Sequence, residues 1–319
     1  MSLDLLRKSI TVVHLVRAAN GVKPLRDFLD SYCVCSAGAQ HELMFVLKGF
    51  KHRTLSREYE DQLGRCAHRR IFVGDWGYDI TAYFRAARET NSGYLIFLNS
   101  FSRILEQDWL AKMHAVAKQP GVGLVGATGS HQGTRVDLMN FPRMIKLAER
   151  AKWKQIILDI PKMKEANKIR LRALARFARL PLFPNPHVRT NAFMLQRDLL
   201  LRLTPQTTVT KRSAYLFEHG RNGMTRQVLR AGLRPVVVGR DGQSFEMAQW
   251  CDSNTFWCNG QDNLLVSDNQ TRNYETVGSS DKALLTWLAW GFDASPSDVT
   301  CSTPQEQGTM RHIQGVTSK

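Results

Sequence analysis

The sequence has no long apolar run and no leader-like segment, which argues against a membrane-spanning protein and against a secreted one. None of its apolar runs approaches the roughly 18 residues that a membrane-spanning helix needs. Residues 1–10 carry Asp4, Arg7 and Lys8 among their leucines, and neither an apolar core nor a small-residue cleavage site follows. We therefore expect neither a membrane-spanning helix nor a secretory signal.

Cysteine is also scarce. The six residues are Cys33, Cys35, Cys66, Cys251, Cys258 and Cys301. Their spacings match no common zinc pattern, and a single Cys-x-Cys pair does not define a metal or redox site. The simplest interpretation is that these cysteines are reduced and that the protein is cytosolic.

Acidic residues are few between positions 143 and 189. This segment holds thirteen lysines and arginines against three acidic residues, so it carries +10 of the chain's net charge of +16. Apolar residues such as Trp153, Ile156 and Phe177 alternate with the basic ones, and Pro161 divides the segment. A pair of solvated helices explains this pattern, and so does an interfacial helix at an anionic membrane. Nucleic-acid binding is the weakest explanation, because the segment lacks a recognition-helix signature.

Short β-rich runs alternate with segments of helical spacing on both sides of this basic insert. We expect strands at 10–16, 41–47, 71–73, 95–98, 122–125, 191–195, 234–238 and 264–266, and helices at 23–32, 56–63, 79–89, 108–118, 197–202, 224–231 and 282–290. This order predicts an α/β fold with a mostly parallel sheet covered by helices. We expect one domain over 1–294, interrupted by the insert at 143–189, and a flexible tail at 295–319.

The chain is organised around the run at 95–98. This run is apolar on both faces, which is typical of a central strand, and Asn99, Ser100 and Ser102 follow it. Ligands of open α/β sheets bind at the carboxyl ends of the strands, so these three side chains are predicted to bind a ligand. An ordinary polar turn after a buried strand is the alternative.

Several motifs resemble one family. Gly93-Tyr-Leu-Ile-Phe-Leu98 precedes a Trp109-Leu110 pair, a Thr-Asn-Ala-Phe-Met strand begins at Thr190, and Glu218-His219 precedes Gly232. Together they resemble the GT-A nucleotide-sugar glycosyltransferases, closest in pattern to glycosyltransferase family 2, over about residues 11–238. The resemblance implies a GT-A-like fold and a transferase that inverts the anomeric centre.

The chain departs from that family's pattern at two positions. Where the family has a metal-binding Asp-x-Asp, this chain has Asn99-Ser100-Phe101. Mg²⁺ and Mn²⁺ prefer carboxylate and water oxygens, so binding of either ion is disfavoured at this position. The sequence predicts no other cofactor. The family's acceptor-activating base falls in the Glu218-His219 pair, and either side chain can take the proton of a sugar hydroxyl.

The resemblance also indicates residues that would bind the nucleotide sugar. Arg17, Lys48 and Arg221 are predicted to offset the charge of the diphosphate, since guanidinium groups bind phosphate oxygens bidentately. Asp75 and Asp79 fall where the family often contacts the base and ribose. Ordinary surface arginines and helix caps are the alternative for these positions.

We therefore expect a glycosyltransferase of polysaccharide biosynthesis that moves a sugar from a nucleotide sugar to a glycan or lipid-linked acceptor and does not require a metal. It would be cytoplasmic, with the insert at 143–189 holding it at the inner face of a membrane. The alternative is a non-catalytic GT-A-like protein that binds a nucleotide sugar, a glycan or a partner. Binding of nucleic acid is supported only by charge.

Overall fold

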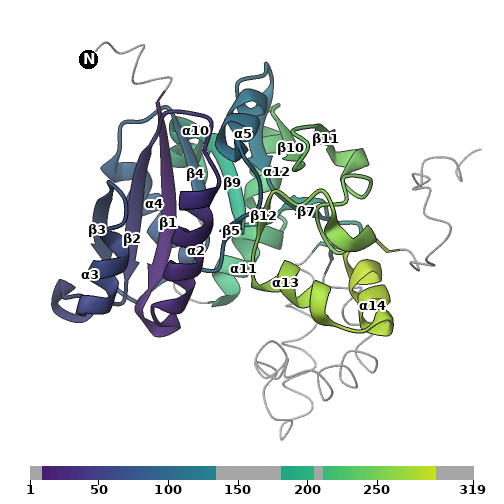
Figure 1. The fold of residues 1–319 in the computed structure, drawn as a ribbon. Helices are drawn as coiled ribbons and strands as arrows, with labels where there is room; N and C mark the ends of the chain where they lie inside the picture. The colour runs from purple at the N-terminus through teal and green to yellow at the C-terminus, as the bar shows by residue number, and fades with distance from the viewer. Residues whose placement is uncertain (1–8, 134–180, 205–210, 292–319) are drawn as a thin grey trace, which may run out of the picture.

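The computed structural model describes residues 9–133, 181–204 and 211–291, which form a layered α/β structure around one central sheet (Figure 1). The tail at 295–319 and most of the basic insert, residues 143–180, lie outside the described residues. None of the helices in the described ranges is both long and apolar enough to cross a membrane.

The central sheet has eight strands. In spatial order they are β11 (Ser244–Glu246), β10 (Arg234–Val238), β6 (Val122–Gly126), β9 (Ala192–Gln196), β4 (Tyr94–Leu98), β1 (Ile10–Arg17), β2 (Glu42–Lys48) and β3 (Arg69–Val73). β9 runs antiparallel to β4 and β6, and β11 runs antiparallel to β10, while the other neighbours are parallel. The prediction of a mostly parallel α/β sheet is confirmed.

Helices cover both faces of this sheet because its six inner strands, from β10 to β2, are apolar and buried on both sides (Figure 1). One face is covered by α2 (Lys23–Val34), α3 (Arg57–Leu63) and α5 (Trp109–Ala117). The other face is covered by α4 (Asp79–Glu89), α10 (Arg197–Arg202), α11 (Lys211–His219), α12 (Met224–Arg230) and α14 (Ser279–Trp290). Helix α4 shows the principle: Ile80, Tyr83, Phe84 and Ala87 share its buried face.

Two short ladders complete the structure beside the main sheet. They pair β5 (Arg103–Ile104) with β12 (Val266–Ser267) and β7 (Gly129–Ser130) with β8 (His187–Val188). The strand expected at 264–266 is thus a two-residue strand in a separate sheet, because Val266 pairs with Ile104. Helix α13 (Asn269–Thr276), which follows β12, was not predicted.

Four single-turn 3₁₀ helices lie in the connections: η1 (Ala18–Asn20), η2 (Lys51–Arg53), η3 (Met247–Gln249) and η4 (Asn259–Gln261). None of the five cysteines in the described ranges forms a disulfide bond.

Candidate functional site

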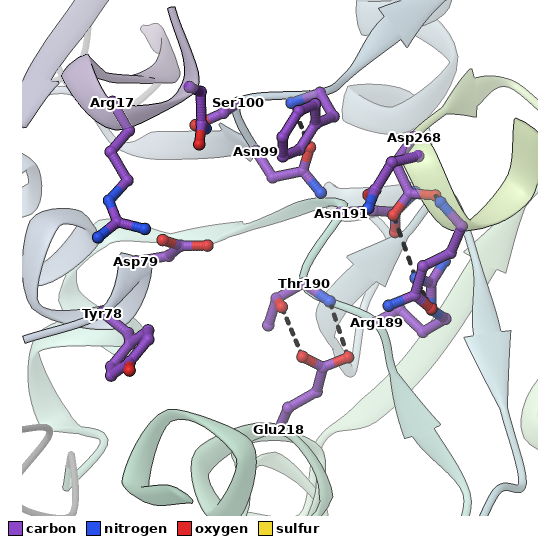
Figure 2. A pocket seen from close by; sticks show the side chains of 14 residues that line it. Arg17, Tyr78, Asp79, Asn99, Ser100, Arg189, Thr190, Asn191, Glu218 and Asp268 are labelled. Carbon is purple, nitrogen blue, oxygen red and sulfur yellow. Dashed lines mark hydrogen bonds and ion pairs between the residues drawn. The ribbon is translucent and has the colours of Figure 1, made fainter. Parts of the chain in front are cut away.

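A pocket of about 280 Å³ opens at the carboxyl edge of the central strands. β1 and β4 end there, and the antiparallel strand β9 begins there, because Leu98 pairs with Ala192. The connections around it complete the wall (Figure 2). The lining residues are Arg17, Asn20, Tyr78, Asp79, Asn99, Ser100, Phe101, Arg189, Thr190, Asn191, Glu218, Asp268, Asn269 and Gln270. The pocket therefore occupies the edge at which open α/β sheets bind their ligands.

The end of β4 forms a tight turn that Asn99 itself closes. The side-chain oxygen of Asn99 accepts hydrogen bonds from the backbone N–H of Phe101 (2.9 Å) and from the Ser102 hydroxyl (3.3 Å). Ser102 is buried, and its hydroxyl also lies 3.0 Å from the Asn191 carbonyl oxygen. The amide nitrogen of Asn99 is thus left on the pocket side, where it is a hydrogen-bond donor (Figure 2).

Charged groups lie at the ends of β1 and β2, and of these Arg17 lines the pocket. Arg17 donates to both carboxylate oxygens of Asp75, at 3.0 and 3.2 Å, and this bond holds the pKa of Asp75 below its usual value. Lys48 is buried and donates to the carbonyl oxygens of Gly74 (3.2 Å) and Trp76 (2.9 Å). Its ammonium group thus fixes the loop before α4 and does not line the pocket.

Asp79 extends from the first turn of α4 into the pocket (Figure 2). It is the first helical residue, so the alternative that it is only the helix cap is wrong, since the cap is Tyr78. Burial raises the pKa of its carboxyl group, and the nearby charges of Lys48 and Arg17 oppose that rise. A carboxyl group in this position can accept a hydrogen bond from a ligand hydroxyl or amine.

Glu218 reaches the pocket from the opposite side, on α11. One carboxylate oxygen accepts a hydrogen bond of 2.6 Å from the Thr190 hydroxyl, and the other accepts one of 3.3 Å from the Thr190 backbone N–H (Figure 2). α11 ends directly afterwards in a close turn, in which a Cβ on Gly223 would lie only 2.8 Å from the Glu218 carbonyl oxygen. The carboxylate is therefore held in one orientation.

His219 lies behind Glu218 and outside the pocket lining. Its ring stacks on Tyr215 with centroids 4.3 Å apart, and it meets the His187 ring at 4.0 Å. Burial lowers the pKa of His219 to about 3, and the charge of Arg189 adds to the effect. Burial also places the pKa of His187 well below its usual value. Both imidazoles are neutral at ordinary pH.

Arg189 closes the third wall. Its guanidinium lies 3.1 Å from Asp268, donates to Gln270 at 2.8 Å, and sits 4.0 Å above the ring of Phe256. Asp268 in turn caps α13 by accepting from the N–H groups of Gln270 (3.0 Å) and Thr271 (2.9 Å). Arg189 is the last residue of the basic insert in the sequence, yet it is buried in this network.

The structure brings together half of the residues predicted for the site. Arg17, Asp79, Asn99, Ser100 and Glu218 line the pocket. The others lie around it or away from it: Lys48, Asp75 and Ser102 support the lining, His219 is packed behind Glu218, and Arg221 is exposed in the turn after α11.

Sequence reasoning missed Arg189, Thr190, Asn191, Tyr78 and Asp268. The sequence offers one indication for Thr190 and Asn191, which immediately precede a predicted strand. That position lies at the pocket edge of the sheet only if the strand is antiparallel to its neighbours.

The end of β4 does not suit a magnesium or manganese ion. The side-chain oxygen of Asn99 is already used twice within its own turn, and Ser100 and Phe101 supply no carboxylate. Asp268, the acidic residue at the next wall, is paired with Arg189. We derive no step through a metal at this strand end.

Comparison with known proteins gives similarity at low levels only. No protein-family model matches the sequence. No curated protein matches it. Among solved structures, the chain is similar to a mannosyltransferase from Pyrobaculum calidifontis in complex with GDP-Man and Mn²⁺, with 14% identity, a TM-score of 0.38 and coverage of 71% of this chain and 53% of that one.

Two further structures have similar values. Glucosyl-3-phosphoglycerate synthase from Mycobacterium tuberculosis has 15% identity, a TM-score of 0.34 and coverage of 62% of each chain. 4-Diphosphocytidyl-2C-methyl-D-erythritol synthase from Anaerococcus prevotii has 12% identity, a TM-score of 0.39 and coverage of 73% of this chain and 89% of that one. Values this low support no inference about function, and the α/β fold is established by the sheet itself.

Proposed function

We propose that the pocket binds a nucleotide sugar and that the chain transfers the sugar, with inversion, to a hydroxyl group of a glycan or lipid-linked acceptor. The observation that carries this proposal is the position of Glu218. Its carboxylate is oriented by Thr190 and faces the pocket from the side opposite the end of β4 (Figure 2). A fixed carboxylate across a pocket from donor-binding groups is the arrangement that a displacement at a sugar carbon requires.

The remaining walls supply groups suited to a nucleotide diphosphate. The ring of Tyr78 and the carboxyl group of Asp79 form one wall, where they can contact the base and the ribose hydroxyls. Arg189 is held in a buried ion pair with Asp268, whereas the pair of Arg17 with Asp75 is at the surface, with 36% of the Arg17 side chain exposed, so Arg17 is the arginine of the lining that can turn to offset diphosphate charge. The amide nitrogen of Asn99 donates a further hydrogen bond to a phosphate oxygen.

The reaction follows from these positions. Glu218 accepts the proton of the acceptor hydroxyl while that oxygen forms a bond to the anomeric carbon. The bond between this carbon and the diphosphate oxygen breaks on the opposite side, and the nucleoside diphosphate leaves with the electron pair. Arg17 and Asn99 stabilise the negative charge that develops on the leaving oxygen.

A second function, binding without transfer, is favoured by one observation. The two carboxylate positions of the family's Asp-x-Asp motif fall on Asn99 and Phe101 here, so the metal that assists departure of the diphosphate in that family has no equivalent ligands at this strand end. A protein that binds a nucleotide sugar and does not cleave it would be consistent with that loss. The same experiment separates the two functions.

The experiment is a thermal-shift panel of nucleotide sugars with and without excess EDTA, followed by a turnover assay with the ligands that bind. A ligand specific for the folded state raises the melting temperature. We expect one nucleotide class to do so and to retain its effect in EDTA. Glu218→Gln should preserve donor binding and lower kcat by about 10²- to 10⁴-fold.

His219→Gln tests the neighbouring residue as the base. If this variant abolishes turnover and Glu218→Gln does not, the two roles are reversed. Donor binding without any turnover would favour the non-catalytic function, and absence of binding across the panel would contradict the proposal.

A further inference from the structure

Three metal-type ligands meet behind the pocket, where α11 packs against β8. Within the described ranges, His187, Glu218 and His219 are the one group of this kind, with ligand atoms that all lie within 4.8 Å of one another. His219 Nε2 lies 3.5 Å from a carboxylate oxygen of Glu218. We propose that these three side chains bind a zinc-type divalent cation.

The hydrogen bonds of His187 set the tautomer that a metal ligand needs. Nδ1 of this ring lies 2.8 Å from the carbonyl oxygen of Asn185. A carbonyl only accepts, so Nδ1 carries the proton and Nε2 carries the lone pair. Nε2 is buried and has no partner among the described residues. Metal-bound histidines typically donate their other ring N–H to a carbonyl or carboxylate in this way.

His219 contributes a second buried imidazole. Its ring is fixed between Tyr215 and His187, and its Nδ1 is buried without a hydrogen-bond partner in the described structure. Buried polar atoms are rarely left unpaired, and each such atom needs an explanation. A cation bound between the two rings would account for buried ring nitrogens that have no partner among the described residues.

The ligand chemistry selects the class of cation. Two imidazoles and one carboxylate form the three-ligand set of open zinc sites, whereas magnesium prefers oxygen ligands. Bonds of about 2.1 Å in tetrahedral geometry place ligand atoms about 3.4 Å apart, so small side-chain rotations suffice to close the site. Glu218 lines the pocket, and the fourth position of the cation would therefore face the pocket.

The metal site shares Glu218 with the proposed transfer, yet it rests on its own geometry. In the structure, the Glu218 oxygen bonded to the Thr190 hydroxyl is not the one facing His219. A cation can therefore bind through the second oxygen while the first keeps its partner. A hydroxyl group in the fourth position would be acidified by the cation.

The test is zinc binding by the metal-stripped full-length chain, measured by competition with a chromogenic chelator, together with the absorption spectrum of added Co²⁺. We expect one equivalent of Zn²⁺ and a cobalt spectrum without thiolate charge transfer. Replacing a residue that only hydrogen-bonds to a metal ligand typically costs 10–100-fold in metal affinity. Loss of a ligand itself, in His187→Gln or Glu218→Gln, should therefore weaken zinc binding by at least about tenfold. His52→Asn, which alters an exposed histidine, should have no effect.

Three results would overturn the metal site: no zinc binding, a thiolate cobalt spectrum, or wild-type affinity in both ligand variants. Because His187 is buried, folding of its variant is checked by circular dichroism. If that variant does not fold, the zinc affinity of Glu218→Gln is the deciding measurement, because the Glu218 side chain is 18% exposed. A nucleoside diphosphate is titrated in parallel. Nucleotide binding without zinc binding rejects only the metal site, and zinc binding without nucleotide binding rejects only the proposed function.

Discussion

Lowering the pH should destabilise this protein through His14, a histidine in the middle of the central sheet. His14 lies on β1 opposite Phe45 of β2 and Leu98 of β4, and it is fully buried. Its ring stacks on Phe28 with centroids 3.8 Å apart. Neither ring nitrogen has a hydrogen-bond partner in the described structure, and burial lowers the pKa to about 3.

The sign and size of the effect follow from proton binding. In the unfolded chain the imidazole has a pKa of about 6.5, so below that pH the unfolded state binds a proton that the folded state does not. Stability is therefore complete above about pH 7 and falls as the pH decreases toward 3. At about pH 5.5 the loss from His14 is about 1.4 kcal/mol, and it changes little if the folded pKa is a unit higher.

His14→Phe isolates this contribution. The substitution keeps an aromatic ring against Phe28 and removes the titration. Free energies of unfolding are measured by urea denaturation at about pH 7.5 and 5.5. The wild type should lose about 1.4 kcal/mol more than the variant between the two conditions, because contributions of other histidines cancel.

Any free-energy cost of packing the larger phenylalanine ring is the same at both pH values, so it cancels when the two free energies of unfolding are subtracted. His52→Asn is the control, because it removes an exposed histidine at a positive φ that asparagine tolerates. Equal losses of stability in His14→Phe and the wild type would refute the reasoning.

Apolar runs predicted most of the sheet. Seven of its eight strands lie within two residues of their predicted bounds, because a buried strand needs a continuous apolar run whatever its neighbours are. The eighth, β11, is three residues long and half-exposed, so it leaves no such run. Asn99 and Ser100, at the end of β4, line the pocket because a polar turn after a central strand must lie at the sheet edge; that they bind a ligand remains a prediction.

The rest of the site depends on contacts between distant segments. Arg189 and Asp268 are 79 residues apart, and in the sequence Arg189 is indistinguishable from the other arginines of the basic insert. Lys48 at the end of β2 resembles a phosphate ligand, but its ammonium group satisfies loop carbonyls. The resemblance to the GT-A family identified Glu218 and remains a prediction, since matches of 12–15% identity do not test it.

Three further predictions follow from single contacts or from charge. Thr190→Val removes the 2.6 Å hydrogen bond to Glu218 and should lower kcat by roughly tenfold to a hundredfold with little change in donor affinity, whereas Thr190→Ser should retain activity. Asp268→Ala leaves the guanidinium of Arg189 buried without its carboxylate and should cost about 3–5 kcal/mol in urea denaturation; a loss below 1 kcal/mol would contradict this. Because residues 143–189 carry +10 of charge, the chain should sediment with anionic but not with neutral vesicles, with about 1 kcal/mol of binding free energy per basic residue near the surface. Added salt should weaken this binding, and equal binding to both kinds of vesicle would exclude a role for anionic lipid.

The direction of β9 determines which side chains form the pocket. Because β9 runs antiparallel to β4, the residues before it, and not those after it, lie beside the end of β4. Thr190 there orients Glu218, while Asn191 accepts from Thr128 at 2.6 Å and donates to Val266 at 3.3 Å. Thr190 and Asn191 form the turn that leads into β9, and their side chains contact α11 and the β12 backbone respectively. A shift of β9 by one residue along β4 would displace this turn and separate Glu218 from its hydroxyl partner. The base proposed for the reaction is therefore positioned by the register of a strand, which no motif in the sequence encodes.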